Sequence, residues 1–130
     1  MIEDYLRQIE ELLSASPAVR DVEIIRRTLR DTEWEKILHY RYRVFLTDGG
    51  LLEMSERLVE MRGVMTTTKY RYHWQDRTGR LHKRWDNAPH HPEIATFPDH
   101  LHDGAEERVV DHAAVTGVEV LQHVLAEIDI

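Results

Sequence analysis

The chain has 130 residues, of which 42% are apolar and 32% charged, and it contains no cysteine. This length suits one compact domain, and the composition is typical of a globular protein. Without cysteine, both disulfide bonds and metal sites with thiolate ligands are excluded. No stretch approaches the roughly 20 apolar residues of a membrane helix. The chain begins Met-Ile-Glu-Asp, with acidic residues where a secretory leader carries basic ones. We therefore expect a cytoplasmic protein that does not insert into a membrane.

The formal net charge of −7 argues against nucleic acid as a partner, because Lys and Arg drive phosphate binding. The charge is unevenly distributed, however. Residues 1–69 hold 11 basic and 13 acidic side chains, residues 70–102 hold 5 and 4, and residues 103–130 hold 1 and 7. Six of the nine histidines also lie in residues 70–102, and their partial protonation near pH ~6.5 would add positive charge. The middle of the chain therefore remains open to an anionic partner.

Apolar spacing predicts a helix at each end of the chain. Residues 1–15 repeat apolar side chains three and four apart, and Pro17 ends the pattern. Residues 116–129 repeat the same spacing behind Thr116, a typical N-cap. Between the helices, alternating polar and apolar residues and two hairpin turns predict strands. The predicted strands are residues 19–29, 34–47, 51–60, 66–75 and 80–85, with residues 109–113 as a short edge strand.

Together these elements predict one α+β domain over residues 1–130. Its core would be an antiparallel sheet of five or six strands, built from hairpins within residues 19–85 and covered on one face by the two helices. Residues 86–104 hold three of the four prolines, so we expect a long Pro/His-rich loop there. Loops of this length inside a compact domain are often functional.

One interpretation of this segment is a metal site. On an extended backbone, His100 and His102 would place their rings on the same side. His90, His91, Asp99 and Asp103 are the further candidate ligands. The spacing lacks the His-Glu-x-x-His pattern of helical zinc sites. We therefore expect no cofactor and keep a divalent metal held by His100 and His102 as the alternative.

A second interpretation is RNA cleavage without a metal, which needs a base, an acid and cations around the phosphate. The candidate catalytic residues are His90, His91, His100, His102, Arg84 and Asp86. The candidate substrate-binding residues are Arg71, Tyr72, Trp74, Lys83, Trp85 and Asn87, with Tyr70 and Arg80 beside them. The aromatic rings would stack on splayed bases.

A purely structural interpretation stands beside these two. Trp74 and Trp85 flank the turn at residues 76–79, where a cross-strand aromatic pair would stabilise the hairpin. Asp86 and Asn87 would then turn the chain and hydrogen-bond to the backbone of the loop.

The run from Tyr72 to Glu93, with the sequence Tyr-His-Trp-Gln-Asp-x-x-Gly-x-Leu-x-x-Arg-Trp-Asp-Asn-Ala-Pro-His-His-Pro-Glu, resembles the TumE family. The resemblance continues through Thr96-Phe-Pro-x-His-x-His-x-Gly104 and, upstream, through residues 46–53 and the N-terminal helix. It does not extend to residues 57–68. These small prokaryotic proteins are toxins of type II toxin–antitoxin pairs. The resemblance implies growth inhibition and a small DNA-binding antitoxin as partner, but it carries over no catalytic residues.

The sequence thus supports a toxin that acts on RNA as a small endoribonuclease through its histidine-rich loop. A non-catalytic module that inhibits a cellular target by docking, and a metal-binding accessory protein, are the alternatives. Both a monomer and a homodimer are compatible with the sequence.

Overall fold

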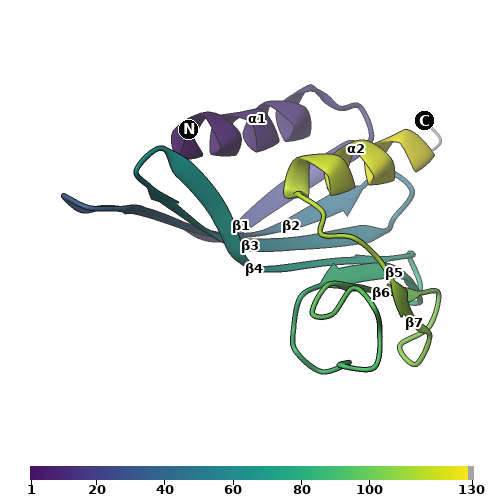
Figure 1. Cartoon of the computed structure of the whole chain (residues 1–130). Helices are drawn as coiled ribbons and strands as arrows, with labels where there is room; N and C mark the ends of the chain where they lie inside the picture. Colours follow the sequence, from purple (N-terminus) through teal and green to yellow (C-terminus); the bar gives the residue numbers. More distant parts are fainter. Residues whose placement is uncertain (129–130) are drawn as a thin grey trace.

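The computed structural model describes residues 1–128, which fold into two layers. One layer is a seven-stranded sheet, and the other consists of two helices that lie on the same face of it (Figure 1). The elements are α1 (Ile2–Ala15), β1 (Val19–Asp31), β2 (Lys36–Leu46), β3 (Leu51–Met61), β4 (Val64–Gln75), β5 (Leu81–Asp86), β6 (His100–Asp103), β7 (Val109–Asp111) and α2 (Gly117–Glu127). None of these helices is long and apolar enough to span a membrane.

The strands follow one another in the sheet in chain order, β1 to β7, and every neighbouring pair is antiparallel. The predicted α+β class, with two helices and one antiparallel sheet, is confirmed. The predicted count of five or six strands is wrong, because the sheet has seven. The missed strand is β6, which lies inside the expected loop of residues 86–104. The irregular segment is therefore shorter, covering residues 87–99.

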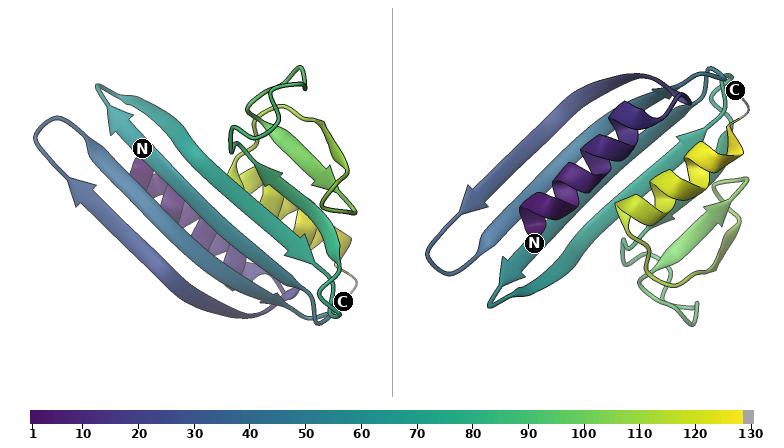
Figure 2. Two further views of the ribbon diagram at one scale, coloured as in Figure 1. Left: turned by 90° about the horizontal axis from the view of Figure 1, so that it is seen from below. Right: turned by 90° about the horizontal axis from the view of Figure 1, so that it is seen from above.

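Alternation along the strands places the core between the sheet and the helices. In β2 the side chains of Leu38, Tyr40, Tyr42, Val44 and Leu46 are all buried, whereas those between them are at least partly exposed. The apolar stripe of α1 packs on this face through Ile2, Leu6 and Ile9. Each fully buried aliphatic side chain contributes about 1.5–3 kcal/mol relative to exposure. The opposite face carries no helix (Figure 2), and we call it the open face.

Local sequence signals set the limits of both helices. The chain leaves α1 at Ser16, where Pro17 disfavours a further helical residue. At α2, the Thr116 side chain accepts a hydrogen bond from the Glu119 amide, and the Glu119 side chain accepts one from the Thr116 amide, which together form a capping box. The predicted end of this helix at residue 129 lies outside the described residues.

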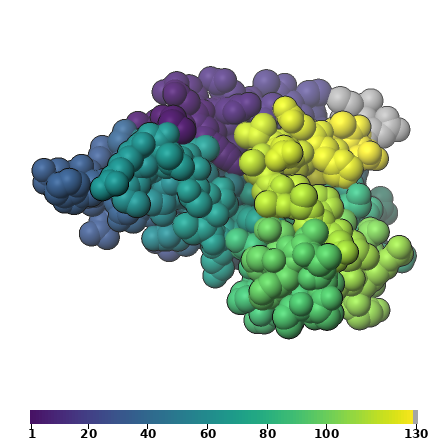
Figure 3. Space-filling model, viewed as in Figure 1, coloured from purple at the N-terminus to yellow at the C-terminus, as the bar shows by residue number. Residues whose placement is uncertain are grey.

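The segment from β5 to β7 forms a lobe beside the main sheet. The space-filling view shows residues 87–99 and the neighbouring turns packed below α2 (Figure 3), on the side of the sheet away from the helices. The β1–β2 hairpin projects at the other end of the molecule. The lobe brings most of the histidine-rich segment onto the open face.

Candidate functional site

The candidate site lies where β4, β5 and β6 adjoin on the open face. Register pairs Asp86 of β5 with His100 of β6, and Arg84 with His102. Alternation then points these four side chains away from α2, while Trp85 and Leu101 between them face the core. Residues 87–99 pass below this part of the sheet and cover the site (Figure 1).

Two imidazoles meet at one carboxylate in the centre of the site. The Nε2 atoms of His100 and His102 lie 3.1 Å apart. Asp86 Oδ1 lies 3.0 Å from Nε2 of His100, and its Oδ2 lies 3.7 Å from Nε2 of His102. All three side chains are buried, with 2%, 5% and 6% of His100, His102 and Asp86 exposed. This packing removes the polar groups from bulk water and fixes their directions.

His91 of the covering loop adds a third imidazole. Its ring centroid lies 5.1 Å from that of His100 and 5.8 Å from that of His102. One ring nitrogen from each of His91, His100 and His102 falls within 4.8 Å of the others, so the three rings are close enough to share one metal ion. We call these three residues the histidine cluster. His90, the fourth predicted imidazole, is exposed and stays outside the cluster.

Arg84 is held by carboxylates on both sides. Its guanidinium donates to Glu106 through two nitrogens, one bond measuring 2.7 Å, and its Nε lies 3.4 Å from Asp86 Oδ2. The bond to Glu106 raises the pKa of Arg84 and lowers that of the Glu106 carboxyl. Burial lowers the pKa of His102, which favours its neutral ring. The sequence predicted Arg84 as a catalytic cation, but these contacts make it a support for Asp86.

A hollow of about 420 Å³ opens onto the cluster. His90, His91, His100 and His102 all line it, together with the cations Lys69 and Arg71. Within residues 1–128, Lys69 and Arg71 form no ion pair, in contrast to Arg84. Burial beside Arg84 lowers the pKa of the Arg71 guanidinium. The four imidazoles proposed from the sequence therefore share one water-accessible hollow, three of them as a cluster.

A larger hollow, of about 520 Å³, lies between α1 and β1. Two of its charged side chains, Arg27 and Glu10, pair with each other at 2.9 Å. None of the histidines in the described residues 1–128 lines it. The smaller hollow is therefore the better candidate.

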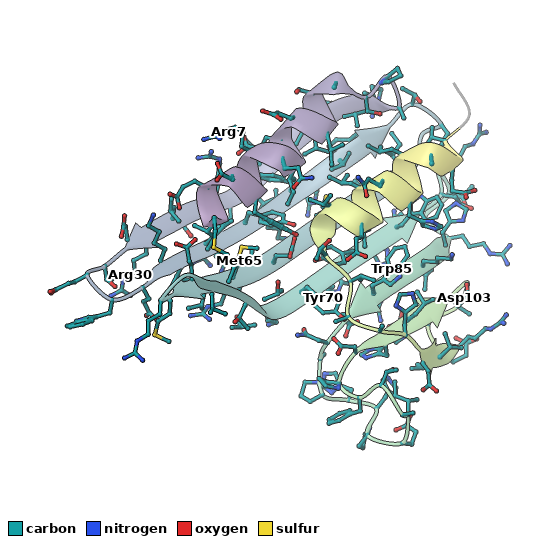
Figure 4. The ribbon with its side chains drawn as sticks, turned by 45° about the horizontal axis from the view of Figure 1, so that its top comes forward. Arg7, Arg30, Met65, Tyr70, Trp85 and Asp103 are labelled. Carbon is teal, nitrogen blue, oxygen red and sulfur yellow. The ribbon has the colours of Figure 1, made fainter. Side chains whose placement is uncertain are left out.

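Three of the four aromatic residues proposed to stack on bases lie elsewhere, and this correction follows from strand alternation. The fourth, Tyr70, lines the hollow, but it is 4% exposed and its hydroxyl donates to Asp99 at 2.6 Å. Tyr72, Trp74 and Trp85 are 0%, 7% and 4% exposed, on the face covered by α2. Figure 4 shows Trp85 on the side of the sheet that faces α2, where its ring meets the edge of His123. Lys83 also contacts His123, at 3.4 Å, and lines a different hollow. Tyr72, Trp74, Lys83 and Trp85 do not line the hollow over the cluster.

The expected cross-strand pair of tryptophans is also absent from the register, which sets Trp85 opposite Tyr72 and Trp74 opposite Lys83. Asn87 lines the hollow, but its amide is used by the backbone. It accepts from the Tyr70 amide at 3.0 Å and donates to the Thr68 carbonyl at 3.3 Å. These two hydrogen bonds fit a structural role for Asn87 better than a role in substrate binding.

The sequence did not point to Lys69 or Glu106. Lys69 lies just before residues 70–102, and Glu106 belongs to an acidic stretch that resembles a solvated surface. Their places at the site follow only from the register, which brings β4 beside β5 and the turn after β6 beside Arg84.

The assembled site combines imidazoles, the carboxylates of Asp86 and Glu106, and the cations Lys69 and Arg71 around an open hollow. Such a set can exchange protons with a bound molecule, hold an anion, or ligate a metal ion. An anionic substrate with an exchangeable proton is therefore the chemistry that suits it.

Comparisons with known proteins agree with the motif in the loop. A search of curated proteins and a search of solved structures each gave no match. A scan against protein-family models matched the family described as "Toxin TumE" over residues 9–130, nearly the whole chain. The chain belongs to the TumE toxin family.

Proposed function

We propose that this toxin inhibits growth by cleaving RNA at the histidine cluster. The observation that carries the proposal is the meeting of three imidazoles below a hollow lined by the unpaired cations Lys69 and Arg71. Membership of a toxin family supplies the biological context and implies an antitoxin partner.

The proposed reaction is attack by a ribose 2′-hydroxyl on the adjacent phosphorus. An O2′–P bond forms and the P–O5′ bond breaks, which gives a cyclic phosphate end and a free 5′-hydroxyl. The cluster takes up the proton of the 2′-hydroxyl, and His90 at the exposed rim donates one to the leaving oxygen. Lys69 and Arg71 stabilise the negative charge that develops on the phosphate.

The open face of the sheet offers a path for the rest of an RNA strand. In register across the sheet, Arg26, Arg41, Ser55 and Arg71 form one row that ends at Asp86 and His100. With strands about 4.8 Å apart, the row from Arg26 to Asp86 is roughly 19 Å long. Although the whole chain is acidic, this face presents cations beside the cluster. Phosphate groups are the ligands that such a row attracts.

We propose that the partner is a small DNA-binding antitoxin that controls the toxin in the cytoplasm. The outer edge of β1 is the surface that suits a protein partner. This strand pairs only with β2 and exposes Ile24, Ile25 and Leu29. Unpaired strand edges with apolar side chains readily add a further strand. Size-exclusion chromatography with and without the antitoxin distinguishes this complex from a homodimer.

Cleavage of labelled single-stranded RNA by purified protein tests the proposed function. Wild type should cleave between pH 5 and 8, whereas Arg71→Gln and His102→Ala should reduce the rate at least about tenfold. His39→Ala is the matched control, because His39 lies on the open face outside the hollow. Absence of cleavage at every pH, with and without added divalent metals, would refute the proposal. If folded His102→Ala still inhibits growth fully, inhibition proceeds by docking.

A further inference from the structure

We propose that the histidine cluster binds one divalent transition metal ion, Zn²⁺ by its ligand set, through Nε2 of His91, His100 and His102. Asp86 lies beside these atoms. It would serve either as the fourth ligand, through a carboxylate oxygen, or as the hydrogen-bond acceptor for a metal-bound water. The inference concerns the site of the proposed function, and it rests on that function only for the consequence for RNA cleavage.

The first argument is the hydrogen bonding of the Nδ1 atoms. His100 Nδ1 lies 2.8 Å from the carbonyl oxygen of Pro98, and His102 Nδ1 lies 2.7 Å from that of Glu106. A carbonyl oxygen can only accept, so both Nδ1 atoms carry the hydrogen. His91 Nδ1 lies 3.1 Å from the Glu93 carboxylate, which also accepts. In the neutral rings, each of the three Nε2 atoms therefore carries a free lone pair.

This pattern is the one that metal-ligating histidines show. Such a histidine donates its second ring nitrogen to a carboxylate or backbone carbonyl, which fixes the tautomer and aims the other nitrogen at the metal. Three anchors of this kind hold the rings here, two from the loop (Glu93 and Pro98) and one from the turn after β6 (Glu106). A solvated surface histidine needs no such anchor.

The second argument is the short distance between the atoms that carry these lone pairs. Nε2 of His100 and Nε2 of His102 are 3.1 Å apart, and Asp86 Oδ1 is 3.0 Å from the former. Once both Nδ1 atoms carry the hydrogen, these three atoms face one another as acceptors. Acceptors at this separation repel unless a cation or an added proton lies between them. The lone pairs of His100, His102 and Asp86 thus converge at one buried place.

The spacing fits a metal better than one shared proton. Two nitrogens on a tetrahedral Zn²⁺, each at about 2.0–2.1 Å, lie roughly 3.3 Å apart. The separation of His100 and His102 is close to this value. A proton shared by those two rings would not require a third imidazole, yet His91 also faces the same point. The ligand atom of His91 lies within 4.8 Å of those of His100 and His102. To reach the tetrahedral spacing it would move inward by at most about 1.5 Å.

The ligand types select the metal. Imidazole favours Zn²⁺, Ni²⁺ and Cu²⁺, whereas Mg²⁺ and Ca²⁺ require oxygen ligands. Three imidazoles and one open or carboxylate position correspond to a catalytic zinc site. The metal enters from the hollow, because the His91 side chain is 30% exposed there. When bound, Zn²⁺ would supply an acidified water, which would replace the imidazoles as the proton acceptor in the proposed cleavage.

Metal binding is tested on tag-free, full-length protein after treatment with a chelator. Titration with ZnCl₂ in a calorimeter should show one ion per chain, and gel filtration should retain it. His91→Ala and His102→Ala should each weaken binding at least about tenfold. His91 belongs to the loop and is partly exposed, so His91→Ala should keep the wild-type circular dichroism spectrum. His39→Ala removes an imidazole outside the cluster and should bind as wild type does.

A second measurement covers variants that lose stability. The melting temperature of wild type should rise on adding Zn²⁺ and not on adding Mg²⁺, and His91→Ala should lose this rise. The proposal is wrong if wild type retains less than one Zn²⁺ per chain, or if His91→Ala and His39→Ala bind it equally. Zinc binding without RNA cleavage would remove the proposed function and leave the metal site. Equal cleavage with and without zinc, by protein that binds none, would remove only the metal site.

Discussion

Replacing Glu56 by leucine should destabilise the protein strongly, whereas replacement by glutamine should not. Glu56 lies on β3 with no exposed surface, between the sheet and both helices. Its Oε1 accepts hydrogen bonds from the hydroxyl of Tyr5 at 2.6 Å, from that of Tyr40, and from the Gly117 amide at 3.2 Å. The carboxyl thus joins α1, β2 and the first turn of α2.

The magnitude follows from the groups left without an acceptor. Leucine removes the acceptor of two buried hydroxyls, while the Gly117 amide keeps a bond to Tyr5 Oη at 2.9 Å. Each unsatisfied buried group costs about 1–3 kcal/mol, so Glu56→Leu should lose about 2–6 kcal/mol. Glutamine keeps the accepting oxygen and places an amide where Oε2 has no partner. Its effect should stay within about 1 kcal/mol at neutral pH.

The pH dependence gives a second test. Burial raises the pKa of Glu56, so the folded protein prefers the protonated carboxyl. Its contribution to stability is complete below the unfolded pKa, near 4.3, and is lost as the pH rises through the folded value. Glu56→Gln should therefore gain stability relative to wild type as the pH rises. Urea unfolding followed by tryptophan fluorescence at pH 4 and pH 7.5 measures this. Equal stability of Glu56→Leu and wild type would refute the argument.

Three further substitutions distinguish residues that stabilise the core from residues of the candidate site. Gly117→Ala would place a Cβ 2.6 Å from the Tyr40 hydroxyl and should lose about 1–3 kcal/mol in urea unfolding. Trp85→Ala should lose about 3–5 kcal/mol by the same assay but leave the RNA affinity of the folded fraction unchanged, since the ring faces the core. Arg71→Gln should weaken RNA binding in a fluorescence anisotropy titration and reduce the slope of log affinity against log salt by about 0.7. Its unfolding free energy should change by less than about 0.5 kcal/mol.

Most of the fold could be predicted because the long strands alternate clearly. Residues 36–46 place an apolar side chain at every second position, which sets both the strand and its buried face. Strand β6 escaped prediction because it has only four residues, His100-Leu-His-Asp103, of which one is apolar. It exists because β5 and β7 supply hydrogen-bonding edges on both sides. Such pairing depends on tertiary contacts that a single sequence does not display.

The candidate site was predicted in part. The density of histidine between prolines pointed to the segment that lines the hollow, but Tyr72, Trp74 and Trp85 were assigned to the wrong face. Along β4, Tyr70, Tyr72 and Trp74 alternate with Arg71 and His73. The period of a strand sends these two sets to opposite faces, so Tyr72 and Trp74 lie in the core and not with Arg71 at the hollow. The same alternation rule that predicted the sheet would have removed the stacking hypothesis.

The separation of the two sheet faces explains how the protein can carry a polar site on a small domain. The helix-covered face supplies stability through aromatic and aliphatic packing, while the open face holds Arg71, Asp86 and the histidine cluster. Arg71, Asp86 and the histidine cluster are not members of the apolar core. The loop of residues 87–99 supplies His91 and the Pro98 carbonyl, so its conformation and the geometry of the cluster are coupled. Any ligand that requires the three rings together must therefore also stabilise the loop.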